Sequence, residues 1–248
     1  MTEALERISD QALVAGATGF TGREVVRVLV EKGVPTIAHL RPDSTRLKEW
    51  TERFQKMGAE VDNTAWELTA MTGTFARLRP AYIFSLLGTT RARVKQVARS
   101  GKDPKTQDYG AVDYGLAALL INAAKAAGIK PVFVYLSAAG TNAKSGSPYY
   151  QARWKLEQEL IKSGLFYVIA RPSFIIGPDR DEKRAGEIYG ARTLDLLLAL
   201  AGIFGLKKMN GRYRSTSNTI LAQALVRLAL DPNCANKIFE SEELRNSD

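Results

Sequence analysis

Residues 13–26 read LVAGATGFTGREVV, in which glycine recurs at every third position between an apolar run and a helical pattern. A buried strand that enters a helix through a glycine-rich turn is typical of dinucleotide binding. Gly16 allows a sharp exit from the strand, Gly19 lets a pyrophosphate approach the backbone, and Gly22 lets the helix pack close to the sheet. The stretch therefore predicts a dinucleotide site. The alternative is a tight turn that binds nothing.

The start of the following helix completes this predicted site. Its first N–H groups lack acceptors within the helix, so they face the phosphates of a bound dinucleotide. Apolar residues then recur at helical spacing until Gly33 provides a stop signal. The further residues assigned to cofactor binding in this segment are Thr18, Phe20, Thr21 and Arg23.

Apolar segments alternate with amphipathic segments along the chain, which predicts an α/β fold with a doubly wound parallel sheet. The predicted strands are residues 12–15, 36–40, 58–62, 81–87, 132–136 and 166–170. The predicted helices are residues 22–32, 46–57, 71–78, 109–127, 149–163 and 219–230. The length and the 45% hydrophobic content suit a single domain over residues 1–248. Residues 173–230 are expected to form a small region that covers the substrate, with an apolar lid at 194–206.

Composition narrows the classes of partner. The net charge of +9, from 35 basic and 26 acidic residues, is compatible with anionic partners. The basic clusters carry no nucleic-acid-binding motif and, apart from Tyr213, no interleaved aromatic residues, so a solvated face or a phosphorylated cofactor is favoured over nucleic acid. One cysteine, Cys234, excludes an internal disulfide, and with one histidine, His39, it predicts no metal site. The polar N-terminus and the short apolar runs predict no secretory signal, no transmembrane segment and a cytoplasmic location.

The choice of cofactor is predicted from the end of the second strand, where residues 39–43 read HLRPD. Proteins that prefer NAD place an acidic residue here for the adenosine ribose, whereas the Arg41 guanidinium can pair with the 2′-phosphate of NADP. NADP(H) is therefore the predicted cofactor, with added positive charge from Arg23. Asp43 favours the opposite choice, because its carboxylate can accept hydrogen bonds from the ribose. His39 is interpreted as a packed or solvated residue.

Further motifs accompany the glycine-rich turn. They are LGTTR at 87–91, LS at 136–137, YYQAR at 149–153 and ARPS at 170–173. Together with GATGFTG at 16–22, they resemble the extended and atypical short-chain dehydrogenase/reductase superfamily over nearly the whole chain. The LGTTR segment is most similar to the Tat-interacting-protein-like atypical group, which includes both reductases and regulators. The resemblance implies a Rossmann-type fold and allows a homodimer through the helices after the fourth and fifth strands.

The resemblance assigns cofactor contacts beyond the glycine-rich turn. At the carboxyl end of the fourth strand, small residues let the cofactor pass and hydroxyl groups reach its ribose. The segment after the sixth strand meets the nicotinamide carboxamide, and an apolar residue after the third strand lies against adenine. The residues implied are Leu87, Gly88 and Thr89 after the fourth strand, Pro172 and Ser173 after the sixth, and Leu68 at adenine.

The resemblance also places any chemistry on Ser137, Tyr149 and Arg153. In the superfamily a tyrosine hydroxyl transfers the proton, a lysine four residues later lowers the pKa of that tyrosine, and a serine positions the carbonyl oxygen. Arg153 stands where the lysine is expected, and its rigid fork reaches a ribose differently from an ammonium group. The alternatives left open are Tyr150 with Lys155 as the charged pair, and Thr141 as the hydroxyl.

These observations predict an NADP(H)-dependent oxidoreductase that transfers hydride to or from a carbonyl-type small molecule. The competing interpretation is a catalytically silent NADP(H)-binding protein that acts as a regulator, a sensor or an assembly factor. The arginine at position 153 suits this second interpretation, since it alters the catalytic pair and leaves the cofactor motifs complete. Nucleic-acid binding through the basic face is a distant third.

Overall fold

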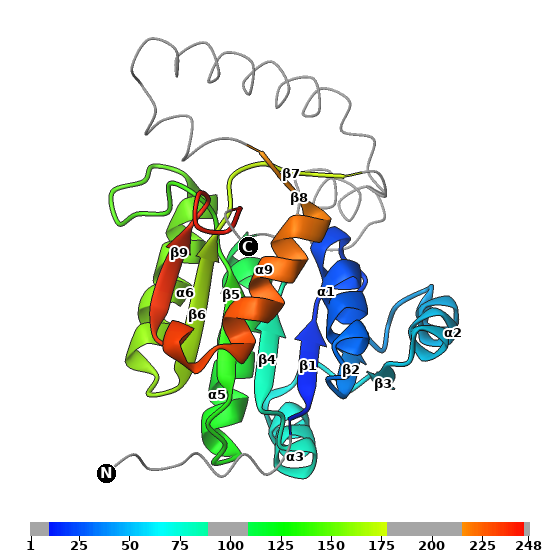
Figure 1. Ribbon diagram of the computed structural model, residues 1–248. Coiled ribbons are helices and arrows are strands. Elements are labelled where there is room, and N and C mark those ends of the chain that lie inside the picture. Colours follow the sequence, from blue (N-terminus) through cyan, green and yellow to red (C-terminus); the bar gives the residue numbers. More distant parts are fainter. Residues whose placement is uncertain (1–9, 89–108, 178–214, 246–248) are drawn as a thin grey trace.

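The computed structural model describes residues 10–88, 109–177 and 215–245. In these residues a seven-stranded sheet lies between two layers of helices (Figure 1). Its strands are β1 (Ala12–Ala15), β2 (Thr36–His39), β3 (Glu60–Asp62), β4 (Tyr82–Ser85), β5 (Val132–Leu136), β6 (Phe166–Arg171) and β9 (Lys237–Glu240). They run in the order β3-β2-β1-β4-β5-β6-β9, and every neighbouring pair is parallel. The predicted doubly wound parallel sheet is confirmed.

Helices cover both faces of this sheet. They are α1 (Phe20–Glu31), α2 (Leu47–Met57), α3 (Leu68–Leu78), α5 (Ala117–Ala126), α6 (Pro148–Lys162) and α9 (Asn218–Leu230), with a π-helix, η2 (Tyr109–Leu116), before α5 and a 3-10 turn, η3 (Pro232–Cys234), after α9. Figure 1 shows α9 crossing one face of the sheet beside α1, against which it packs.

The apolar pattern of the strands follows from burial on both faces. In β1, Ala12 and Val14 belong to the core under α1, α2 and α9, whereas Leu13 and Ala15 belong to the core under α3, α5 and α6. Successive side chains of a strand point to opposite faces, so a strand covered on both sides is apolar throughout. This pattern made β1 and β5 predictable to the residue.

The largest differences from the sequence-based expectation lie outside these central strands. β9 was not predicted, because Lys237–Glu240 is a partly exposed edge strand without a clear apolar alternation. The predicted helix at 109–127 is not α-helical throughout, because its first eight residues, Tyr109–Leu116, form a π-helix. Ile175–Ile176 (β7) and Thr216–Ser217 (β8) form a separate two-stranded sheet. The expected lid at 194–206 lies outside the described residues.

The order of the strands locates the edge where a ligand binds. β1 continues through α1 to β2 on one side, and the chain later returns to place β4 on the other side of β1. In open α/β sheets ligands bind outside the carboxyl ends of the strands at such a reversal. The turns after β1, β2 and β4 therefore form the candidate site.

Candidate functional site

The glycine-rich turn joins β1 to α1 under tight steric limits. Gly16 has a φ of +84°, and a Cβ atom built there would lie 2.7 Å from the carbonyl oxygen of Leu86. A Cβ atom at Gly22 would lie 2.1 Å from the carbonyl oxygen of Gly16. The N–H group of Gly19 donates to that same oxygen at 2.9 Å and closes the turn. The first and third glycines are therefore required by the fold, as predicted from their spacing.

A cavity of about 460 Å³ opens beside this turn. Gly16, Thr18 and Gly19 form one wall, and residues that follow β2 and β4 form the others. α1 begins at Phe20 and no side chain caps its N-terminus, which leaves the positive end of the helix dipole at this turn. The small residues, the volume and the helix N-terminus together fit a dinucleotide with its pyrophosphate at the start of α1.

The end of β2 supplies the part of the cavity predicted to hold the adenosine half. Arg41 and Asp43 both line it, and the Nε of Arg41 lies 3.9 Å from a carboxylate oxygen of Asp43. The guanidinium of Arg23 is buried and lies 5.6 Å from the ring centre of Trp50, which itself lines the cavity. Arg41 therefore lies at the cavity wall, and Arg23 packs against Trp50 of that wall.

The structure does not bring Leu68 into the cavity. Leu68 is the first residue of α3 and is 48% exposed. Trp66, two residues earlier, lines the cavity together with His39. Sequence analysis missed Trp66, although a tryptophan four residues after the end of β3 is an available signal, since large aromatic residues commonly form the walls of ligand sites.

Leu87 and Gly88 after β4 also line the cavity, as expected. A Cβ atom at Gly88 would lie 3.4 Å from the Nη2 of Arg153 and 3.5 Å from a carboxylate oxygen of Asp113. The cavity wall at Gly88 therefore lies directly against the side chains of Arg153 and Asp113. Thr89, the next predicted contact, lies outside the described residues.

Arg153 is buried and its guanidinium is held by other parts of the protein. Its Nη2 donates to the carboxylate of Asp113 at 2.7 Å, and its Nη1 donates to the carbonyl oxygen of Leu136. Its Nε has no hydrogen-bond partner among the described residues. Asp113 belongs to the π-helix, so this ion pair fixes η2 against α6. The two outer nitrogens of Arg153 are thus already engaged on groups of the chain.

Tyr149 lies on the same helix face as Arg153, whose guanidinium is 4.6 Å from the centre of the tyrosine ring. Burial raises the pKa of the Tyr149 hydroxyl, and the positive charge of Arg153 opposes this shift. The alternative pair is not brought together, because Lys155 lies over the ring of Tyr114, 4.0 Å from its centre. The structure therefore pairs Tyr149 with Arg153.

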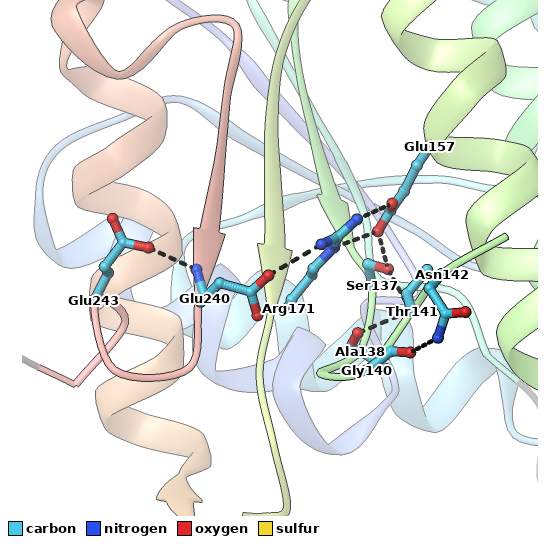
Figure 2. Close-up of polar contacts among 9 residues, drawn as sticks. All are labelled: Ser137, Ala138, Gly140, Thr141, Asn142, Glu157, Arg171, Glu240 and Glu243. Atoms are coloured by element: carbon cyan, nitrogen blue, oxygen red, sulfur yellow. Dashed lines mark hydrogen bonds and ion pairs between the residues drawn. The ribbon is translucent and has the colours of Figure 1, made fainter. Parts of the chain in front are cut away.

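Ser137 is turned toward a buried carboxylate (Figure 2). Its hydroxyl donates to an oxygen of Glu157 at 2.5 Å. Arg171 donates to both oxygens of the same carboxylate, at 3.0 and 2.6 Å, and to Glu240 on β9 at 3.0 Å. Since a carboxylate in a bidentate pair with arginine is an acceptor only, the hydroxyl hydrogen of Ser137 points into this network. Thr141, 3.4 Å away, donates its own hydrogen to the carbonyl oxygen of Ala138.

Sequence analysis also missed this network, although one part of it has a sequence signal. Tyr149, Arg153 and Glu157 are spaced by four residues, which places them on one face of α6. The partners Arg171 and Glu240 come from β6 and β9, and only the fold brings these strands together. The network therefore needed the structure.

Pro172 and Ser173 are tied to neighbouring loops and do not line the cavity. The carbonyl oxygen of Pro172 accepts a hydrogen bond from the N–H of Ala139 at 2.8 Å. The N–H of Ser173 donates to the hydroxyl of Ser241 at 3.2 Å. Their predicted contact with the nicotinamide stays a prediction.

Comparison with known proteins agrees with the geometry of the cavity. Residues 16–192 match the model of a family described as NAD(P)H-binding. The chain belongs to this NAD(P)H-binding family. It is 33% identical over 177 residues to protein FMP52-1, mitochondrial, of Scheffersomyces stipitis, which covers 69% of this chain and 70% of that protein. It is 29% identical over 177 residues to protein TIC 62, chloroplastic, of rice, which covers 66% of this chain and 35% of that protein.

Solved structures show the same fold. A UDP-glucose 4-epimerase of Thermotoga maritima has a TM-score of 0.62 at 21% identity, over 92% of this chain and 75% of that chain. A UDP-glucose 4-epimerase of Thermus thermophilus, in complex with NAD, has a TM-score of 0.60 at 14% identity, over 95% of this chain and 81% of that chain. With the family match, these likenesses confirm the resemblance to the extended and atypical short-chain dehydrogenases/reductases.

One expectation from the sequence is wrong. A cytoplasmic location was predicted from the polar N-terminus, yet the relatives from Scheffersomyces stipitis, Candida albicans and several other fungi are named as mitochondrial proteins. The expectation rested on the absence of a secretory signal and of a membrane span, and neither feature tests for import into an organelle. No helix within residues 10–88, 109–177 and 215–245 is long and apolar enough to cross a membrane.

Proposed function

We propose that this protein binds NADP(H) in the cavity beside the glycine-rich turn and acts through the bound state, as a regulatory or sensor protein with little or no turnover. One observation carries the proposal. The glycine-rich turn and the residues after β2 and β4 form a cavity that fits a dinucleotide, whereas the two polar groups expected to assist catalysis are engaged within the protein. Arg153 is bonded to Asp113 and Leu136, and Ser137 is bonded to Glu157.

The residues that would hold the cofactor follow from the cavity. Gly16 and Gly19 line the cavity at the N-terminus of α1, where the pyrophosphate would lie, and Gly88 lines it after β4, where the nicotinamide half would lie. Arg41 at the cavity wall favours NADP over NAD, because a guanidinium matches a 2′-phosphate in charge and geometry. A bound nicotinamide supplies the capacity to give or accept hydride.

The surroundings of Tyr149 argue against efficient proton transfer. In the superfamily pattern the cation beside the tyrosine also holds the nicotinamide ribose, but the guanidinium of Arg153 already binds Asp113 and a main-chain carbonyl group. The charge of Asp113 opposes the effect of this guanidinium on Tyr149. Burial raises the pKa of Tyr149, which makes its hydroxyl a weaker proton donor.

A reductase is the second candidate, and the contact between Arg153 and Tyr149 favours it. The guanidinium lies 4.6 Å from the ring centre. Its positive charge lowers the pKa of Tyr149, whereas burial has the larger effect and raises it. A protonated Tyr149 can act as a general acid toward a carbonyl oxygen. Such activity would be constant near neutral pH and would fall at high pH, as the tyrosine loses its proton through its raised pKa.

Turnover of NADPH with a panel of aldehydes and ketones separates the two candidates. We expect the wild-type protein to oxidise NADPH no faster than Tyr149→Phe, because Tyr149 is not arranged to pass a proton. Absorbance of NADPH at neutral pH measures this, with equal dinucleotide affinity of the two proteins as the control. A carbonyl compound that the wild type reduces at least tenfold faster than Tyr149→Phe, with the loss of rate at high pH described above, would establish the reductase instead.

The preference for NADP(H) depends on Arg41. We expect Arg41→Ala to bind NADPH roughly tenfold more weakly and NADH unchanged, because a charge-assisted pair with the 2′-phosphate contributes about 1.5 kcal/mol. Calorimetric titration with both dinucleotides measures this. Arg27→Ala is the matched control, since Arg27 is paired with Glu31 and does not line the cavity. An unchanged preference in Arg41→Ala would remove the phosphate role of this residue.

A further inference from the structure

The side chain of Asn218 links the start of α1 to a segment from the last third of the chain. Its amide donates from Nδ2 to the carbonyl oxygen of Phe20 at 3.3 Å. Phe20 is the first residue of α1, and Asn218 is the first residue of α9. Figure 1 shows α9 beside α1, with β8 entering α9 near the carboxyl ends of the strands. The contact therefore lies at the same end of α1 as the glycine-rich turn.

The orientation of this amide follows from its partner. The carbonyl oxygen of Phe20 is an acceptor only, so the nitrogen of the Asn218 amide faces α1. The amide oxygen then faces Gly177, where a Cβ atom would lie 2.3 Å from Oδ1 and 2.7 Å from the ring of Phe20. Gly177 and Asn218 meet because they follow β7 and β8, whose last residues, Ile176 and Ser217, are paired. The amide is thus held between α1 and the backbone after β7.

Burial and neighbouring contacts keep Asn218 in this position. The residue is only 4% exposed. The hydroxyl of Ser217 accepts a hydrogen bond from the N–H of Ile220 at 3.1 Å and caps α9. The hydroxyl of Thr219 donates to the carboxylate of Glu24, one turn further along α1, at 3.5 Å. Removal of a side chain this buried leaves a cavity beside the first turn of α1.

We infer that Asn218 is a positioning residue for the dinucleotide, because it sets where the first turn of α1 lies. This rests on the proposed function. No side chain caps α1, and its first N–H groups are those proposed to face the pyrophosphate. A hydrogen bond to a phosphate oxygen weakens steeply when its donor is displaced or misaligned. Asn218 does not line the cavity, so it acts on the ligand through Phe20 and α1.

Titration of Asn218→Ala with NADPH and with adenosine 2′-monophosphate tests this inference. The monophosphate carries the 2′-phosphate proposed to pair with Arg41 but has no pyrophosphate, so its binding does not depend on the start of α1. We expect Asn218→Ala to bind NADPH about fivefold more weakly, as one lost hydrogen bond predicts, and the monophosphate with unchanged affinity.

Two further variants sharpen this test. Asn218→Asp keeps the shape of the side chain, but a carboxylate cannot donate to Phe20 and adds negative charge near the pyrophosphate. It should bind NADPH about tenfold more weakly. Asn233→Ala is the matched control, since Asn233 is exposed and follows the opposite end of α9. It should change neither affinity. Circular dichroism shows whether each variant is folded under the conditions of the titration.

The outcomes separate this inference from the proposed function. Wild-type affinity for NADPH in Asn218→Ala or in Asn218→Asp would overturn the inference and leave NADP(H) binding intact. Equal losses of affinity for NADPH and for the monophosphate in a folded Asn218→Ala protein would also overturn it, because the residue would then support the cavity as a whole. Failure of the wild type to bind NADPH would overturn the proposed function and the inference together.

Discussion

Gly22→Ala should abolish dinucleotide binding and lower the free energy of unfolding by about 3 kcal/mol. A Cβ atom at this position would lie 2.1 Å from the carbonyl oxygen of Gly16 and 2.9 Å from the Cα of Ala17, both of which are backbone atoms. α1 can accommodate the methyl group only by moving away from β1. That movement displaces the N-terminus of the helix from the cavity and from any pyrophosphate bound there.

Gly73→Ala is the matched control for this prediction. Gly73 also lies inside a helix, α3, but a Cβ atom there meets nothing within 4 Å. Alanine at an unobstructed helical position is more favourable than glycine by about 0.5–1 kcal/mol, so this variant should gain stability and bind NADPH normally. Urea unfolding followed by circular dichroism and titration with NADPH measure both quantities. Normal NADPH affinity in Gly22→Ala would show that the turn is not the cofactor site.

Arg153→Met is expected to destabilise the protein by about 3–5 kcal/mol, because it leaves the buried Asp113 carboxylate without its guanidinium partner. A catalytic arginine in an open site would be replaced at little cost in stability. Chemical unfolding of the purified variant measures the loss. A change of less than about 1 kcal/mol would contradict the structural role of this ion pair.

The double variant Asp113→Asn/Arg153→Met is the control for charge burial. It replaces the buried carboxylate that has lost its guanidinium partner by a neutral amide, so roughly half of the lost stability should return. Arg153→Lys keeps the positive charge but lacks the second nitrogen that reaches the carbonyl oxygen of Leu136, and should fall between the wild type and Arg153→Met. If the loss of stability in the double variant equals the sum of the losses in Asp113→Asn and Arg153→Met, the two side chains do not depend on each other.

The parts of this fold that local chemistry determines were predictable from the sequence. The turn at 16–22 requires glycine because its backbone contacts leave no space for a side chain, and this requirement is visible as a spacing. β1 and β5 are apolar on both faces and were predicted with their observed ends. β9 pairs with β6 at the edge of the sheet, and its partly exposed residues carry no such pattern.

A residue of the candidate site was predictable only where its position after a strand fixes its place in the fold. Leu87 and Gly88 lie where their motif placed them, at the cavity. Leu68 does not, because α3 begins at this residue and its side chain is exposed. Ser137 and Arg153 occupy the predicted positions, but their hydrogen-bond partners decide what they can do. Those partners are 20 and 40 residues away in the sequence, so no local pattern reveals them.

A crystal structure of the protein with NADP bound tests the central claim most directly. We predict a dinucleotide in the cavity with its pyrophosphate at the N-terminus of α1, while Arg153 remains bonded to Asp113 and Ser137 to Glu157. An empty cavity at saturating NADP would contradict the assignment of the site. An Arg153 that leaves Asp113 to contact the nicotinamide ribose, with Ser137 turned from Glu157 toward Tyr149, would contradict the silent, cofactor-binding role and favour a reductase.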